Sequence, residues 1–324
     1  MDKLSYLERL LTPPERTSAG CSFGDIPIPI TFDDSKVCII GMPIDITTTF
    51  GKTASFGPEA IRTASAKQIE TLVYEMDSEI YEKALIYDMG DLNFVKPKKG
   101  NVSDIKDINQ FWLDFDPIMS SILGVITDSK KMPVILGGEH TITYSVYKEL
   151  SERNPLLIHF DAHRDMKSSY QGMPMCHTTP FYHLIKKGYL RGTDLVQIGI
   201  RQGDREENKF ARDNDVTTFD AWDCNSSLGK IVEWLKSHTY KRDIYISFDI
   251  DVFDISYLPC TGTPEPFGID PFQILNLINS ISDTARLAGL DFVETGLKNN
   301  DYREGTLATQ TLLRILSRPY MSNI

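Results

Sequence analysis

The histidines of this chain are unevenly spread along the sequence. Five of the six fall between positions 140 and 183, namely His140, His159, His163, His177 and His183. Imidazole is a common metal ligand and also a general acid or base near neutral pH. The neighbouring residues must therefore decide between chance clustering and a chemical site.

Three short motifs place acids or histidines directly after apolar runs. They are GGEHT (137–141), DAHRD (161–165) and DIDVFD (249–254). Short, continuous apolar runs are typical of strands buried in a parallel sheet. Ligands of open parallel sheets bind beyond the carboxyl ends of the strands. The polar residues of these motifs are therefore the first candidates for a site.

The spacing within the motifs predicts convergence. Asp161, His163 and Asp165 alternate along the chain, so in an extended segment they face one side, as do Asp249 and Asp251. The candidate set is His140, Asp161, His163, Asp165, Asp249 and Asp251. Four crowded carboxylates repel and raise one another's pKa. Two divalent cations remove this repulsion and need about this many ligands.

The donor types narrow the choice of metal. Mixed nitrogen and oxygen ligands suit Mn²⁺, Zn²⁺, Fe²⁺, Co²⁺ or Ni²⁺, and carboxylate-rich sites favour Mn²⁺. The three motifs contain no cysteine, which argues against a structural zinc site.

A purely structural interpretation competes with the metal site. Acids at strand ends often cap the following helix, and one such motif alone is weak evidence. Three motifs, each at the end of a strand, favour the metal site. His159 is expected to support the ligands or to be a core residue, whereas His183 and His238 are expected to be helical surface or core residues.

The elements that must position these residues alternate along the chain. Eight apolar runs predict strands: 37–41, 85–89, 133–136, 156–160, 195–200, 216–219, 244–248 and 287–292. Helical patterns lie between most of them: 57–69, 108–126, 142–151, 179–187, 228–238, 271–282 and 305–316. This alternation predicts an α/β, three-layer αβα fold with about eight mostly parallel strands.

The predicted organisation is one catalytic domain, residues 37–324, preceded by an arm, residues 1–36. The arm contains Pro13, Pro14, Pro27 and Pro29. It is expected to form a short helix and an irregular stretch that is suited to packing against a neighbouring subunit.

Composition excludes several classes of protein. Of the 324 residues, 41% are hydrophobic and 24% are charged, which is ordinary for a globular protein. The net charge of −11 argues against nucleic acid or an anionic membrane as the main partner. No run approaches a membrane span, and the N-terminus lacks the pattern of a signal peptide. Five scattered cysteines without a CxxC pair indicate reduced thiols, so a cytoplasmic location is expected.

At these motifs the sequence resembles the ureohydrolase family, which includes arginases and agmatinases. The resemblance rests on GGEHT, on DAHRDM (161–166) and on SFDIDVFDISYLPCTGTPEPFGI (247–269). GMPID (41–45), SFGPEAIR (55–62) and LDFVE (290–294) add to it, in a pattern closest to agmatinases. It covers roughly residues 37 to 320.

The resemblance implies a binuclear centre, usually with two Mn²⁺ ions. It assigns one ion to His140, Asp161, Asp165 and Asp249. It assigns the other ion to His163, Asp161, Asp249 and Asp251, so that Asp161 and Asp249 bridge. It also implies that His177 carries protons, that Glu294 binds the substrate guanidinium, that Thr263 contacts substrate and that Asp165 is catalytic as well as a ligand. Trimers or hexamers are the implied assemblies.

The implied reaction is hydrolysis of a linear guanidino compound to urea and an amine by a metal-bridging hydroxide. A metal pair makes hydroxide available at neutral pH, and the leaving amine needs a general acid. Two metals offset the four ligand carboxylates, so hydroxide and Glu294 leave the site negative and suited to a cation. Agmatine is the first candidate, yielding putrescine and urea.

Several alternatives remain open from the sequence. Glu139 replaces the usual Asp, Cys260 and Phe267 replace glycines, and Thr295–Leu297 differs from the usual segment. The loop 166–176 resembles that of agmatinases in length but contains Lys167 and no acid, although Asp204, Glu206 and Glu207 lie further on. Guanidinobutyrate, guanidinopropionate, arginine, guanidine or formiminoglutamate are therefore alternative substrates. A zinc deacetylase and a non-catalytic metal-binding regulatory protein are the competing functions.

Overall fold

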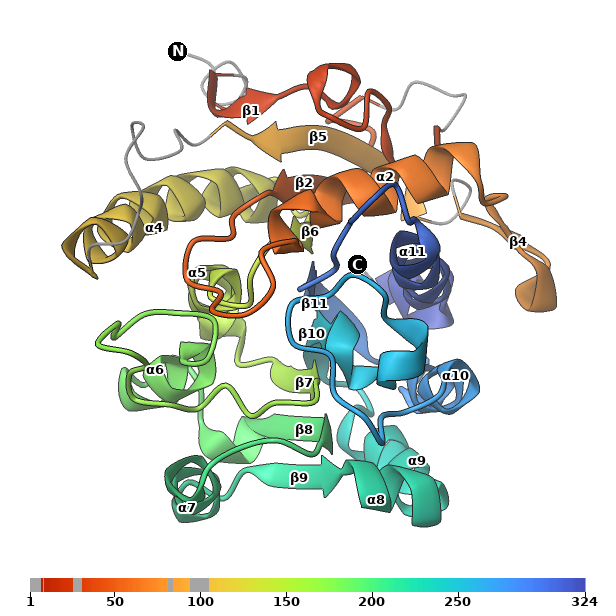
Figure 1. The fold of residues 1–324 in the computed structure, drawn as a ribbon. Helices are drawn as coiled ribbons and strands as arrows, with labels where there is room; N and C mark the ends of the chain where they lie inside the picture. The colour runs from red at the N-terminus through yellow and green to blue at the C-terminus, as the bar shows by residue number, and fades with distance from the viewer. Residues whose placement is uncertain (1–6, 8, 26–30, 81–83, 94–104, 324) are drawn as a thin grey trace.

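The centre of the molecule is a nine-stranded sheet with helices on both faces (Figure 1). The structure is a computed structural model that describes residues 7, 9–25, 31–80, 84–93 and 105–323. The strand order is β1-β5-β2-β6-β11-β10-β7-β8-β9. Only the β1–β5 pair is antiparallel among the described pairings of this sheet. The predicted three-layer αβα fold is confirmed.

All eight predicted strands are present, and one is added. The nine are β1 (Leu11–Thr12), β2 (Val37–Met42), β5 (Ile86–Leu92), β6 (Met132–Gly137), β7 (Leu156–Phe160), β8 (Leu195–Ile200), β9 (Thr217–Asp220), β10 (Asp243–Asp249) and β11 (Arg286–Val293). The residues of β2, β6, β7 and β8 are buried throughout. Because both faces of these strands are buried, their sequences are continuous apolar runs without alternating polar residues. A separate two-stranded sheet joins β3 (Leu72–Val73) and β4 (Ser78–Glu79).

Each face of the sheet has its own layer of helices and its own hydrophobic cluster. One layer contains α4 (Ile105–Asp128), α5 (Ile142–Leu150), α6 (Pro180–Lys186) and α7 (Arg205–Asp213). The other contains α2 (Gly57–Lys67), α8 (Ala221–Ser226), α9 (Leu228–His238), α10 (Pro271–Ser280) and α11 (Arg303–Leu316). The seven predicted helices are confirmed, and α7 and α8 are additional. No helix in the described part of the chain is both long and apolar enough to span a membrane.

The N-terminal arm contributes to the sheet of its own chain. β1 pairs with β5, with Leu11 opposite Leu92. Leu7 and Leu11 are buried in the same cluster as α4. The described part of the arm therefore packs on its own domain, whereas residues 1–6, 8 and 26–30 lie outside the described residues. The boundary at residue 36 stays a prediction.

Four adjacent central strands position the candidate site. In the order β6-β11-β10-β7, their carboxyl ends lead into His140, Glu294, the acids that follow Phe248, and the DAHRD motif. Gly138 permits the close packing at the end of β6, because a Cβ there would lie 1.9 Å from the backbone oxygen of Ile44. A side chain at this position would push apart two of the loops that form the site.

Candidate metal centre

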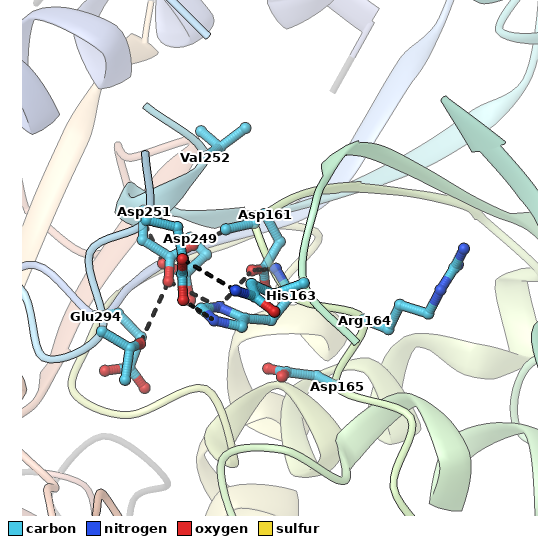
Figure 2. Close-up of polar contacts among 12 residues, drawn as sticks. Asp161, His163, Arg164, Asp165, Asp249, Asp251, Val252 and Glu294 are labelled. Carbon is cyan, nitrogen blue, oxygen red and sulfur yellow. Dashed lines mark hydrogen bonds and ion pairs between the residues drawn. The ribbon is translucent and has the colours of Figure 1, made fainter. Parts of the chain in front are cut away.

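The six predicted ligands come together at this edge of the sheet. Figure 2 shows Asp161, His163, Asp249 and Asp251 directed toward one another, whereas Arg164 points away. Nδ1 of His140 lies 3.0 Å from Oδ2 of Asp165 and 3.1 Å from Oδ2 of Asp161. Oδ2 of Asp249 lies 3.2 Å from the same nitrogen. One imidazole therefore faces three carboxylates.

The second histidine faces the other part of the cluster. Nδ1 of His163 lies 3.0 Å from Oδ2 of Asp251 and 3.5 Å from Oδ1 of Asp161. Asp161, His163 and Asp251 form a group whose ligand atoms could all reach one ion. Asp161 also belongs to a second such group, with His140 and His159. The carboxylate of Asp161 thus lies between two potential cation positions.

The convergence is as predicted, but the expected reason for it is wrong. β7 ends at Phe160, so residues 161–165 do not continue an extended strand. They form a turn in which the backbone N–H of His163 donates to Asp161, and Asp165 has a left-handed backbone with φ of 52°. Asp251 lies on a 3-10 turn and donates its N–H to Asp249. Turns, not strand alternation, aim these side chains.

Burial and mutual repulsion dominate the electrostatics of the carboxylates. Burial, followed by the charge of Asp161, raises the pKa of Asp165 to about 7. Burial and the charges of Asp251 and Asp161 raise the pKa of Asp249 well above its ordinary value. For Asp161, burial is outweighed by the neighbouring histidines, which hold its pKa well below the usual range. Such a cluster is costly as bare anions and fits bound cations.

Hydrogen bonds behind His140 fix the role of its two ring nitrogens. Ser247 donates its hydroxyl proton to Asp291 over 2.7 Å. Its oxygen therefore accepts from Nε2–H of His140, which is 2.9 Å away. Burial lowers the pKa of His140, but the hydrogen bonds of Nδ1 to the three carboxylates outweigh it and raise the pKa well above its ordinary value in the metal-free protein. The metal-free site therefore holds a proton where the imidazole meets three carboxylates, and a metal ion can take the place of that proton, so the donor set fits a metal ion.

His159 supports the cluster from behind and was only loosely anticipated by the sequence. Arg164 donates to Oε1 of Gln197 over 2.9 Å, so the amide nitrogen of Gln197 is the donor to Nδ1 of His159, 3.1 Å away. Nε2 of His159 therefore carries the proton and donates to Oδ2 of Asp161 over 2.7 Å. His159 is thus a hydrogen-bond donor to Asp161 and does not present a free lone pair. No sequence pattern marked Gln197.

The remaining predicted site residues border the cluster. Glu294 is buried with φ of 58°, and its Oε1 accepts the backbone N–H of His140 over 2.8 Å. Burial, followed by the charge of Glu139, raises the pKa of Glu294 well above its usual value. The hydroxyl of Thr263 donates to Oδ2 of Asp251 over 3.4 Å. Thr263 thus lies next to a predicted ligand.

His177 lies in the loop before α6, close to the two predicted histidine ligands. Burial, and then repulsion from His163 and His140, lowers the pKa of His177 to about 4. The ring is therefore neutral at pH 7 in the metal-free protein. Its Nδ1 lies 3.2 Å from the hydroxyl of Thr47, which no sequence pattern marked.

A buried acid that the sequence did not single out ties the loops of the site together. Glu304, the second residue of α11, accepts the backbone N–H groups of Cys260 over 3.0 Å and of Thr261 over 2.9 Å. Its other oxygen accepts the N–H of Gly296. Burial raises the pKa of Glu304 to about 7. The loop that contains Thr263 and the segment after Glu294 are thereby held to one carboxylate.

Known proteins resemble this chain along most of its length. The arginase family model matches residues 35–315. An agmatinase from Halalkalibacterium halodurans is 32% identical over 289 residues, covering 87% of this chain and 91% of that protein. An agmatinase from Bacillus cereus is 31% identical over 267 residues, covering 82% and 84%. The solved structure of proclavaminate amidino hydrolase from Streptomyces clavuligerus has a TM-score of 0.77 at 26% identity, covering 93% of this chain and 97% of that one. The family model and these relatives show that the chain belongs to the arginase family and is a ureohydrolase enzyme, whose motifs converge on one acidic cluster.

Proposed function

We propose that this enzyme hydrolyses a linear guanidino compound to urea and an amine, with agmatine as the first candidate substrate. The observation that carries the proposal is that Nδ1 of His140 is aimed at three carboxylates, beside a second group in which His163 faces Asp161 and Asp251. This arrangement supports two adjacent cation positions.

The proposed ligands are those implied by the family resemblance. One cation would be held by His140, Asp161, Asp165 and Asp249, and the other by His163, Asp161, Asp249 and Asp251. Mn²⁺ is the proposed ion, because oxygen ligands predominate. When bound, the two cations supply Lewis acidity that makes water an effective nucleophile at neutral pH.

The residues around the cations supply binding and proton transfer. Glu294 is the proposed partner of the guanidinium group, since a buried carboxylate with a raised pKa is stabilised by an incoming cation. His177 is the proposed proton carrier. Its ring lies beside the cluster and is neutral at pH 7 in the metal-free protein, and an imidazole in that position can accept a proton and return it to the leaving amine.

The cavity beside the cluster favours a substrate with a cationic tail. A cavity of about 380 Å³ is lined by four acids, Asp165, Asp204, Glu207 and Glu265, and by two cations, Lys167 and Arg164, so acids predominate. Arg164 is held by hydrogen bonds to Asn208, Gln197 and Thr218. Lys167 already pairs with Asp204 and, over 3.0 Å, with Glu207. It is therefore a poor partner for a substrate carboxylate.

Glu265 is the proposed partner of the amine tail. It accepts from Gln202 over 3.2 Å and lies 3.7 Å from Nε2 of His163. Within the described part of the chain, no Lys or Arg side chain forms an ion pair with it. Its hydrogen bond with His163 lowers the pKa of Glu265, so the side chain is an ionised acid at the cavity that can also bind an ammonium group, which supports agmatine over a guanidino acid.

A substrate panel tests this proposal. Urea release is measured with Mn²⁺ for agmatine, arginine, guanidinobutyrate, guanidinopropionate and guanidine. We expect the highest kcat/KM for agmatine and a decrease of about tenfold or more in Glu265→Gln, since the ammonium group of the substrate would lose its charged partner. Glu206→Gln, which alters an exposed acid nearby, serves as control. No urea from any compound with any divalent metal would refute the reaction, and preference for a guanidino acid would refute the substrate.

A homo-oligomer and a cytoplasmic location complete the proposal. The five cysteines are free thiols, which is compatible with a reducing compartment. Several large apolar side chains, including Phe50, Phe267 and Phe272, are strongly exposed and are candidates for burial between subunits.

A further inference from the structure

The hydroxyl of Thr47 occupies the space between a buried carboxylate and the ring of His177. It lies 2.6 Å from Oε1 of Glu139 and 3.2 Å from Nδ1 of His177. The backbone N–H of His177 also donates to this hydroxyl over 3.0 Å. Both neighbours of Thr47 are distant in sequence, so the fold alone brings the three residues together.

The surroundings of Glu139 determine the direction of these hydrogen bonds. Its Oε2 accepts the backbone N–H groups of Ile46 and Thr47, each over 2.6 Å. Its Oε1 faces the hydroxyls of Thr47 and Thr141, each at 2.6 Å. Burial raises the pKa of Glu139, but four donors surround its two oxygens and favour the ionised carboxylate, which only accepts. Thr47 must therefore donate its single hydroxyl proton to Glu139.

The donor and acceptor in each remaining hydrogen bond of the Thr47 hydroxyl are then determined. A hydroxyl has one proton and two lone pairs. With the proton directed to Glu139, the two lone pairs accept from the backbone N–H and from Nδ1–H of His177. The neutral ring of His177 thus has its proton on Nδ1 and its lone pair on Nε2.

We infer that Thr47 and Glu139 are positioning residues that hold His177 in the Nδ1–H tautomer, with Nε2 as the nitrogen that exchanges protons with the reacting groups. This inference rests on the proposed role of His177. The proton that Nε2 takes from the attacking water passes to the leaving nitrogen as its bond to carbon breaks, so the ring returns to its starting state. Glu139 differs from the usual family residue and is not an expected ligand. Its proposed function is to orient the hydroxyl of Thr47.

Removing the hydroxyl of Thr47 tests the inference. Thr47→Val keeps the shape but deletes the acceptor for His177. General acid–base catalysis contributes roughly 10²–10⁴-fold, so we expect kcat to fall at least about tenfold while KM changes less than about threefold. Thr47→Ser should restore kcat to within about threefold of the wild type. Thr141→Val is the matched control, because it removes a hydrogen bond of equal length to the same oxygen of Glu139. The hydroxyl of Thr141 lies 3.5 Å from that of Thr47 but makes no described hydrogen bond to His177.

A double-mutant cycle separates positioning from a general structural role. In a His177→Ala background, Thr47→Val should cause no further loss of kcat, because Thr47 acts through the missing ring. An equal loss in both backgrounds would overturn the inference, as would wild-type kcat in Thr47→Val. A loss of kcat in Thr141→Val as large as that in Thr47→Val would also overturn it.

A second measurement requires no substrate. ¹⁵N NMR of histidine-labelled, metal-free protein, with His177→Asn used to assign the signals, should show a protonated Nδ1 and an unprotonated Nε2 in His177. Thr47→Val should lose this pattern. A proton on Nε2 in the wild type would overturn the inference even in an active enzyme. If the pattern is present but no guanidino compound yields urea, the tautomer stands and the proposed function fails.

Discussion

At the scale of single residues, the hydrogen bonds that support the predicted ligands are as specific as the choice of those ligands. His159 donates to Asp161, and its tautomer is set by Gln197, whose amide is in turn oriented by Arg164. Partners of this kind fix the orientation and basicity of metal ligands. The sequence predicts the candidate ligands, because they follow strand ends, but it does not mark Gln197, because that contact depends on how β7 and β8 are aligned.

Replacing Gln197 tests whether the tautomer of His159 matters. In Gln197→Glu both side-chain oxygens accept, so Nδ1 of His159 must become protonated. The ring then either stops donating to Asp161 or becomes a cation beside the metals, and both outcomes weaken metal binding. We expect the Kd for Mn²⁺, measured by calorimetry on metal-free protein, to rise about 10-fold or more.

The matched control for Gln197→Glu is Asn208→Ala. Asn208 accepts from Arg164 over 2.6 Å, and the described contacts place it away from His159. Equal changes in Kd for the two variants would contradict this account of His159.

The low pKa of His177 predicts a pH-dependent stability. Its pKa is about 4 in the folded, metal-free protein, because of burial and repulsion from His163 and His140, and near 6.5 when unfolded. As the pH falls from about 6.5 toward 4, the unfolded state therefore binds a proton that the folded state does not, and stability decreases. Between pH 7 and 5, the free energy of unfolding should fall more in the wild type than in His177→Asn. Equal slopes in the two proteins would contradict the shifted pKa.

At the scale of elements, the edges of the fold were harder to predict than its centre. The eight strands with continuous apolar runs and the seven helices between them were predictable from the pattern. β1 has only two residues, and its place depends on pairing with β5. α7 is polar along most of its length and begins with a capping box made by Asp204 and Glu207, so it lacks a strong apolar pattern. α8 has only six residues.

One buried ion pair joins two of these elements. The guanidinium of Arg62 on α2 is fully buried, and its Nε and Nη2 lie 2.8 and 2.9 Å from the carboxylate of Asp88 on β5. Arg62 also pairs with Asp91 and donates to the carbonyl of Gly90 over 3.0 Å. Despite this pairing, burial raises the pKa of Asp91. The pairing compensates two carboxylates that are otherwise poorly solvated.

Removing Arg62 should therefore destabilise the fold. Arg62→Met leaves Asp88 and Asp91 without their partner, and breaking a buried pair costs about 3–5 kcal/mol. The control is Lys209→Met, which breaks an exposed pair with Asp213 on α7 and should cost less than about 1 kcal/mol. Urea denaturation of the metal-free proteins measures both. Similar losses in the two variants would show that Arg62 is not a structural link.

At the scale of the whole molecule, the net charge of −11 has two components. Four of the acids, Asp161, Asp165, Asp249 and Asp251, are gathered in the cluster at the sheet edge. Two divalent cations would bring the formal charge to −7. The other acids are largely distributed over the surface and in ion pairs.

Metal binding should therefore stabilise the folded protein as a whole. A ligand that binds only the native state adds about 2.7 kcal/mol at 100 times its Kd. Adding Mn²⁺ to chelator-treated protein should raise Tm by several degrees. The increase should be lost in Asp161→Asn and kept in Asp213→Asn, which alters an exposed acid. A Tm that does not respond to any divalent metal would contradict the cation sites.

The central claim is that this cluster hydrolyses a guanidino compound through bound divalent cations. The most direct test is urea release from agmatine by metal-free protein to which Mn²⁺ is added in steps. We predict activity that rises to a plateau near two Mn²⁺ per chain and falls at least about 100-fold in Asp161→Ala or Asp249→Asn, since these residues are proposed to bridge both ions. Full activity in the metal-free protein, or undiminished activity in both variants, would contradict the claim.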